Sequence, residues 1–187
     1  MIKRTLRPCV GNEVDAVMGI EYVVWRDGGR ICVEYDIHGM LSHLVIPEQG
    51  SGATDKRRDD LWRHTCFELF VKEADEKKRG YLECNFAPSG NWNVYSFGSH
   101  RKEMADAEIV ANPVITTTTM KKMYSLRAEV DLTGLVSESS VIDIGVSCIV
   151  ENRNGKQGYW ALSHPKETPD FHDPRSFLIR LIGTNPN

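Results

Sequence analysis

Apolar and polar residues alternate with a period of two along most of this chain, and helical spacing is nearly absent. Successive side chains of a β-strand point to opposite faces, so this period is typical of strands with one buried face. The segments 20–26 and 30–39 alternate in this way on either side of Asp27-Gly28-Gly29, whose glycines tolerate the positive φ angles of a tight turn. The sequence therefore predicts a β-hairpin at this position.

The same alternation recurs in further segments, which are separated by glycine, proline, asparagine or charged turn residues. These segments are 65–72, 81–90, 91–98, 107–120, 123–135, 141–162 and 176–181. About ten short strands, with turn signals at intervals of roughly ten residues, are typical of two packed antiparallel sheets. We therefore predict an all-β fold, namely an antiparallel β-sandwich of jelly-roll type with about ten strands.

Three local features modify this pattern. Residues 46–60 are rich in glycine, serine, aspartate and charge without an apolar period, which predicts a long loop. Pro113 lacks a backbone N–H and predicts an edge strand or a bulge. A short helix is also expected at 99–106 or at 132–138.

The composition fits a single ordinary domain. The chain has 187 residues, of which 41% are hydrophobic and 26% are charged, so residues 1–187 suffice for one core. The formal net charge of −3 and the short basic stretches argue against nucleic acid as a partner. The charged N-terminus lacks a long apolar run, and no segment could span a bilayer, so we expect a cytoplasmic protein without a membrane partner.

The five cysteines are odd in number and contain no Cys-x-x-Cys pair. They are Cys9, Cys32, Cys66, Cys84 and Cys148. Four of them lie in strand-like apolar patterns, where a free thiol behaves as a small hydrophobic side chain. We expect these thiols to be reduced and buried, and we expect no zinc site built from them.

Alternation also assigns side chains to the faces of the predicted strands. Phe67, Leu69 and Val71 share one face, whereas Cys66, Glu68 and Phe70 share the other. If the strands 65–72, 81–86 and 125–132 are neighbours, one sheet face is apolar and the other carries polar groups. That second face would bear Glu68, Tyr81, Glu83, Asn85, Arg127 and Glu129.

Two interpretations of this polar face are open. Antiparallel sheets often leave one face in water, and the polar residues then only keep the surface soluble. Alternatively, carboxylates, an amide and a guanidinium beside aromatic rings suit a ligand with many hydroxyl groups. The curvature of the sheet decides between them.

The tryptophans differ in their positions along the predicted strands. Trp25 lies inside an alternating strand, which predicts a core position. Trp62, Trp92 and Trp160 each lie beside a turn or loop, where a ring can cap the core or serve as a platform for a ligand.

Histidines and acids raise the question of catalysis. His64, His164, Asp170 and His172 are suitable metal ligands, although they lack the spacing of a known metal motif. Glu68 and Glu83 could act as a carboxylate pair, as in glycoside hydrolysis. No nucleophile elbow, phosphate-binding loop or dinucleotide fingerprint is present. An enzyme is therefore the less favoured interpretation.

The segment from Leu61 to Arg101 resembles the core signature of DOMON-like proteins that are related to family 9 carbohydrate-binding modules. A tryptophan-led strand ending in an acidic Glu-Leu-Phe is followed by an aromatic-Glu-x-Asn strand and a Pro-x-Gly turn. The residues that carry this pattern are Trp62, Glu68, Phe70, Glu83, Asn85, Pro88 and Gly90.

The end of the chain is similar to the C-terminal signature of a bacterial, uncharacterised DOMON-like subgroup. The residues that carry this similarity are Trp160, His164, Pro165, Pro169, Asp170, Phe171, His172 and Phe177. The resemblance spans about residues 20–181. It implies a jelly-roll sandwich in which one sheet face and its loops bind a sugar or haem. Trp92 and Trp160 are candidates for a tryptophan clamp on a sugar, whereas no methionine stands in a context that matches a haem ligand.

The leading hypothesis is a non-catalytic domain that binds a carbohydrate or another small polar ligand, without a cofactor or metal. The expected ligand-binding residues are His64, Glu68, Glu83, Asn85, Trp92, Arg127, Trp160, His164, Asp170 and His172. One alternative is a metal-dependent or carboxylate-based enzyme that uses His64, His164, Asp170 and His172. Another is a structural or interaction domain without a small ligand.

Overall fold

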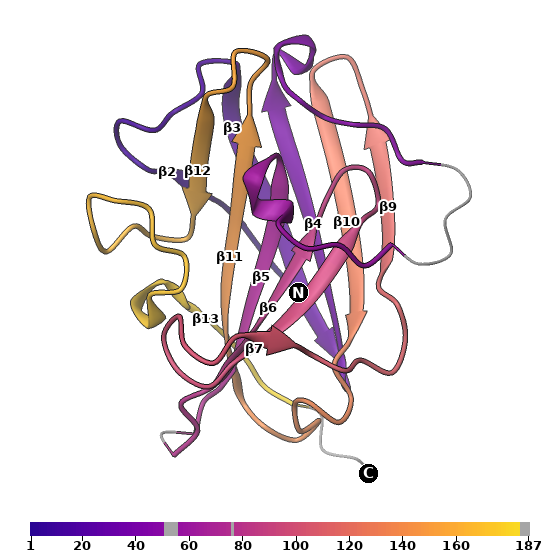
Figure 1. The fold of residues 1–187 in the computed structure, drawn as a ribbon, viewed down its shortest axis with the longest axis vertical. Helices are drawn as coiled ribbons and strands as arrows, with labels where there is room; N and C mark the ends of the chain where they lie inside the picture. Colours follow the sequence, from indigo (N-terminus) through magenta and orange to yellow (C-terminus); the bar gives the residue numbers. More distant parts are fainter. Residues whose placement is uncertain (51–55, 76, 184–187) are drawn as a thin grey trace.

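Two antiparallel β-sheets pack face to face in a computed structural model, which describes residues 1–50, 56–75 and 77–183 (Figure 1). The first sheet, sheet A, has the strand order β1-β3-β4-β10-β9. Its strands are β1 (Ile2–Thr5), β3 (Val17–Asp27), β4 (Arg30–Gly39), β9 (Val114–Thr119) and β10 (Met123–Asp131).

The second sheet, sheet B, has the strand order β2-β12-β11-β5-β6-β7-β8. Strand β13 pairs with the N-terminal end of β11. Its strands are β2 (Arg7–Pro8), β5 (Cys66–Glu73), β6 (Tyr81–Phe86), β7 (Trp92–Phe97), β8 (Ala105–Asp106), β11 (Ile142–Glu151), β12 (Gln157–Ala161) and β13 (Ile179–Leu181). The prediction of an all-β antiparallel sandwich is thus confirmed. Among the strands of the described residues, alternation missed β1, β2 and β8, which are too short to show a period.

The predicted turns explain how these strands connect. Asp27 pairs with Arg30, so Gly28 and Gly29 form a two-residue hairpin loop in which Gly28 has a φ of +58°. Pro113 directly precedes β9, which lies at the edge of sheet A as expected. Of the predicted loop 46–60, residues 51–55 lie outside the described part of the chain.

The expected helices at 99–106 and 132–138 are absent from these described segments. A bridge joins Ser99 to Lys102, and Arg101 and Glu103 have positive φ angles that no helix contains. A bridge between Thr133 and Val136 closes the other segment as a turn. The short 3₁₀ helices lie elsewhere, at η1 (Leu41–His43), η2 (Leu61–Arg63) and η3 (Pro174–Ser176).

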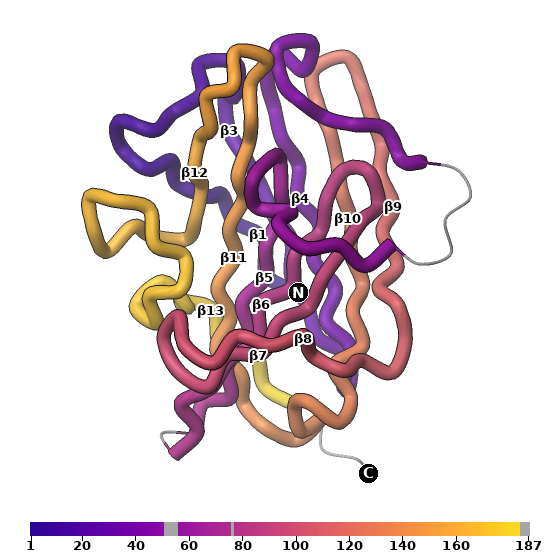
Figure 2. The backbone as a smooth tube through the Cα atoms, viewed as in Figure 1, coloured from indigo at the N-terminus to yellow at the C-terminus, as the bar shows by residue number. Residues whose placement is uncertain are grey.

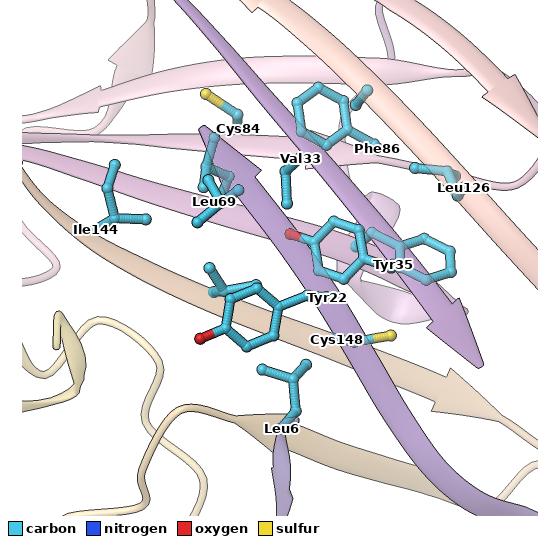
Figure 3. Close-up of a cluster of buried hydrophobic side chains, with 14 of the residues drawn as sticks. Leu6, Tyr22, Val33, Tyr35, Leu69, Cys84, Phe86, Leu126, Ile144 and Cys148 are labelled. Carbon is cyan, nitrogen blue, oxygen red and sulfur yellow. The ribbon is translucent and has the colours of Figure 1, made fainter. Parts of the chain in front are cut away.

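The main core fills the space between the sheets. Side chains of β3, β4 and β10 meet those of β5, β6 and β11 (Figure 3). The ring of Tyr35 in β4 is tilted against that of Phe67 in β5, with 5.0 Å between the ring centroids. All five cysteines are buried and free, and Cys84 and Cys148 lie within this core. No helix in the described residues is both long and apolar enough to cross a membrane.

Candidate functional site

The face of sheet B that points away from the main core carries its own buried cluster. Alternation along β5 and β6 places Phe67 and Cys84 in the core, and therefore Glu68 and Glu83 on the opposite face. Pairing of Glu68 with Ser147 of β11 extends this face toward the neighbouring strand. The strand register thus gathers polar groups at the centre of the sheet, as alternation predicted for β5 and β6.

Three segments rise around this face and form walls. They are η2, the turn 99–104 and the C-terminal loop, which we define as residues 162–178. Figure 2 shows the turn 99–104 beside the C-terminal loop, where Arg101 contacts Asp170. Together the walls and the sheet form a half-open cavity of about 440 Å³. This volume falls in the range of small-molecule sites.

Aromatic rings form most of the apolar lining of the cavity. These rings belong to Trp62, Phe97, Tyr159 and Phe171. The polar lining is contributed by Arg63, Glu68, Glu83, Arg101, Gln157 and His172. The cavity therefore combines flat apolar surfaces with hydrogen-bonding groups.

A second layer of aromatic contacts fixes the C-terminal loop on the sheet. Phe177 of the loop stacks on Phe70 of β5 at 5.6 Å between ring centroids, and it meets Tyr81 of β6 in an edge-to-face contact at 5.9 Å. Gly145 lies directly under this contact, because a Cβ atom there would lie 2.7 Å from the Phe177 ring. The absence of a side chain at residue 145 lets the loop approach the sheet closely.

Glu68 and Glu83 form a buried carboxyl pair at the floor of the cavity. Their exposed fractions are 2% and 4%. Glu68 Oε2 accepts a hydrogen bond from the Ser147 hydroxyl at 3.0 Å, and Glu83 Oε1 accepts one from the Asn85 amide at 2.8 Å. Burial raises the pKa of Glu83 to about 7, and burial followed by repulsion from Glu83 raises the pKa of Glu68 well above its usual range. At neutral pH the pair therefore retains protons.

His172 reaches the cavity from the C-terminal loop. Tyr81 Oη accepts a hydrogen bond from the Arg101 backbone N–H at 3.2 Å, and it lies 2.7 Å from His172 Nδ1. Burial, and next the charge of Arg101, lower the pKa of His172 to about 3, so the ring is neutral at physiological pH. Because the Tyr81 hydroxyl donates a hydrogen bond to Nδ1 of the neutral ring, the ring proton lies on Nε2, and Nε2 lies 3.6 Å from Glu83 Oε2.

Both arginines that line the cavity have carboxylate partners outside the carboxyl pair. Arg101 donates to Asp170 Oδ1 from Nε at 3.1 Å and from Nη2 at 2.9 Å. Arg63 lies 3.1 Å from Asp60. Partial burial raises the pKa of Asp170. Hydrogen bonds from Lys166 and Arg101 outweigh burial and lower this pKa to about 2.

The structure brings only some of the expected ligand-binding residues together. Glu68, Glu83 and His172 line the cavity, Asn85 supports Glu83 from the same strand, and Asp170 holds Arg101 at the rim. The shared face of Glu68, Glu83 and Asn85 was predicted by alternation. The position of His172 depends on the docking of the loop.

The expected placement of Trp92 and Trp160 on this face is wrong. Trp92 is 3% exposed and Trp160 is 5% exposed, and both belong to the main core. Trp92 pairs with Phe86 across β6 and β7, so the register turns both rings inward. Both rings are buried although each lies beside a turn, because strand register and alternation determine which face of the sheet a side chain occupies.

Arg127 lies on the other sheet. Strand β10 pairs with β4 and β9 rather than with β5 or β6, so Arg127 is exposed on the outer face of sheet A. There its guanidinium lies 5.0 Å from the ring of Trp25. The core position predicted for Trp25 is also wrong, because Tyr22 and Val24 take the inward positions of β3.

The histidines and Asp170 that defined the metal hypothesis have separate partners. His64 Nδ1 contacts Glu151 at 2.7 Å, and His164 Nε2 donates to the Arg7 carbonyl at 2.9 Å. Asp170 and His172 contact different groups, as described above. No cluster of three or more His, Cys, Asp or Glu side chains in the described ranges is arranged to hold a metal ion.

Several cavity residues were not among the expected site residues. Tyr159 lies next to Trp160 in the sequence, and alternation alone places it on the opposite face of β12. This signal was available in the sequence. Arg101 and Phe171 lie in irregular segments, for which alternation gives no face.

Comparison with known proteins bears on the fold. No protein-family model and no curated protein matches this sequence. A candidate carbohydrate-binding protein from Bacteroides uniformis superimposes with a TM-score of 0.62 and 13% identity, and the match covers 94% of this chain and 83% of the other.

Two further similar structures are family 9 carbohydrate-binding modules from Caldicellulosiruptor kristjanssonii. The module in complex with glucose has a TM-score of 0.57 and 10% identity over 90% of this chain and 79% of the module. The complex with cellotriose has a TM-score of 0.51 and 8% identity over 86% and 71%. At these identities the similarity establishes the fold, and this chain has the β-sandwich fold of family 9 carbohydrate-binding modules.

Proposed function

We propose that this protein is a non-catalytic carbohydrate-binding domain whose site is the cavity on the outer face of sheet B. The observation that carries the proposal is the buried pair Glu68 and Glu83 beneath aromatic walls in a cavity of about 440 Å³. Aromatic faces cover the C–H surfaces of a sugar ring, and carboxyl groups bind its hydroxyls. Structures with the same fold include complexes with glucose and with cellotriose.

The test compares two tryptophans on opposite sides of the molecule. Trp62 lines the cavity, whereas Trp25 lies on the outer face of sheet A. Glucose and cellotriose are titrated, and binding is measured by calorimetry and by thermal shift. The wild type and Trp25→Ala should bind these sugars, whereas Trp62→Ala should lose at least tenfold in affinity. A sugar bound only by the folded state raises the melting temperature. Absence of binding by glucose, cellotriose and other simple sugars at millimolar concentration contradicts the proposal.

The carboxyl pair also favours a second function, a carboxylate-based glycoside hydrolase. A glutamic acid with a pKa of about 7, as Glu83 has, is suited to donate a proton to a leaving group. Prolonged incubation with cello-oligosaccharides, followed by chromatography, distinguishes the two functions. Shorter products that disappear with Glu83→Gln support hydrolysis, whereas intact oligosaccharides support binding alone.

Two narrower proposals concern relationship and location. The DOMON-like relationship is supported by the order of its motif residues, among which Glu68, Glu83 and His172 meet in one cavity. A cytoplasmic location is supported by five buried, unpaired cysteines, because free thiols are typical of reducing compartments.

A further inference from the structure

We infer that the ligand selected by this cavity carries a protonated amine, as an amino sugar does, and that the ammonium group binds against Glu68 and Glu83. The inference rests on the proposed function, since it places the amine on a saccharide. It follows from the hydrogen-bonding state of the carboxyl pair, from the partners of the nearby cations and from the aromatic lining.

Each carboxyl group presents one oxygen without a hydrogen bond. Within the described residues, Glu68 Oε2 and Glu83 Oε1 have partners, whereas Glu68 Oε1 and Glu83 Oε2 have none. His172 Nε2 lies 3.6 Å from Glu83 Oε2, which is too long for a hydrogen bond. Both glutamates line the cavity, so these two oxygens are available to hydrogen-bond donors of a ligand that enters it.

The cations that line the cavity compensate the charge of the pair only in part, because Arg101 lowers the pKa of both glutamates less than burial raises it. Arg101 and Arg63 make their ion pairs with Asp170 and Asp60 and not with the glutamates. His172 is neutral because its pKa is about 3. An isolated pair of buried carboxylates is unfavourable, and the raised pKa values of Glu68 and Glu83 express this cost. A ligand cation would supply the missing charge and displace a proton from the pair.

The aromatic lining adds a second interaction with a cation. Trp62, Phe97, Tyr159 and Phe171 surround the cavity, and an ammonium group close to a ring face is attracted by its π electrons. Because the rim arginines are already paired with aspartates, their repulsion of a cationic ligand is weakened. A neutral sugar uses the same rings through its C–H faces but leaves the carboxyl pair protonated, so it gains no ion pair with it.

The experiment compares glucosamine with glucose and N-acetylglucosamine by titration calorimetry on the full chain. At pH 7 glucosamine should bind at least tenfold more tightly than either neutral sugar. Its affinity should fall about tenfold between pH 7 and pH 5.5, because binding must then release a proton from the pair. The heat of binding should also vary with the ionisation enthalpy of the buffer, which measures the proton released.

A variant pair isolates the role of the carboxyl group. Glu83→Gln should lose both the preference for glucosamine and its pH dependence, whereas Glu48→Gln, at an exposed position, should keep them. The pH profile of the wild type needs no variant, so the test stands even if Glu83→Gln folds poorly.

The outcomes separate this inference from the proposed function. Equal affinity for glucose and glucosamine, or an affinity for glucosamine that does not depend on pH, overturns the inference and leaves carbohydrate binding intact. Absence of binding by all three sugars counts against both.

Discussion

The Arg101 guanidinium donates two hydrogen bonds to one carboxylate oxygen of Asp170, at 3.1 Å and 2.9 Å. The two residues lie 69 positions apart in the sequence, one in the turn 99–104 and one in the C-terminal loop. This contact closes one side of the cavity rim. It also gives Asp170, an expected ligand-binding residue, a role in positioning a wall.

Asp170→Asn should loosen the rim and reduce sugar affinity several-fold, because the charge that holds Arg101 is removed. The matched control is Asp143→Asn, since Asp143 makes a similar two-point contact with Arg180 outside the cavity lining. The control should leave the affinity unchanged, as measured by calorimetry. Equal losses in both variants contradict a specific role of the rim contact.

The ion pairs of Asp170 should also affect acid stability. The pKa of Asp170 is about 2 in the folded protein, below its usual value near 3.8. The ionised Asp170 carboxylate therefore stabilises the folded form above about pH 4, and this stabilisation is lost as the pH falls toward 2. Asp170→Asn should flatten the loss of stability in this window, which thermal denaturation at several pH values would reveal. If the difference in stability between the variant and the wild type is the same at pH 4 and at pH 2, the low pKa of Asp170 is contradicted.

Glu83→Gln should change the pH dependence of stability in the opposite direction. Because the pKa of Glu83 is raised from 4.5 to about 7, its contribution is fully present below pH 4.5 and is lost as the pH rises through 7. The free energy of unfolding of the variant, measured relative to that of the wild type, should therefore increase by about 1 kcal/mol or more as the pH rises from 5 to 8. Chemical denaturation at both pH values measures this difference, and a constant difference contradicts the expected titration.

Tyr81→Phe should destabilise the protein by about 1 kcal/mol, because it removes the partner of His172 Nδ1 and of the Arg101 N–H. Tyr22→Phe provides the control. The Tyr22 hydroxyl is buried without a hydrogen-bond partner in the described residues, so its removal should be neutral or stabilising. Thermal denaturation of both variants compares a bonded with an unbonded buried hydroxyl, and equal changes count against the Tyr81 network.

Gly145→Ala should displace Phe177 and weaken the docking of the C-terminal loop. The added Cβ atom would lie 2.7 Å from the Phe177 ring and 3.2 Å from Phe70 Cβ. Such overpacking typically costs about 1–3 kcal/mol, and sugar affinity should fall with it. Gly19→Ala is the control, because a Cβ atom at Gly19 meets nothing within 4 Å. Denaturation and calorimetry on both variants check the result, and an unaffected Gly145→Ala shows that the loop docks without this contact.

The sequence by itself determined the longer strands and the alternation of faces along β5 and β6. The period of two is a local property, and it correctly separated Glu68 and Glu83 from the core residues Phe67 and Cys84. The glycines after Asp27 likewise specified a two-residue hairpin. These features depend only on neighbouring residues, because the alternation of side chains holds for any strand in any sheet.

The tertiary structure alone decided which strands share a sheet and which loops cover it. Arg127 has the same alternation as Glu68, yet β10 pairs with β4, so Arg127 lies on the far side of the sandwich. Arg101 meets Asp170 across 69 positions of the sequence, and Phe177 docks over Gly145. Pairing and docking are set by contacts between residues far apart in the chain, and a local period carries no information about them.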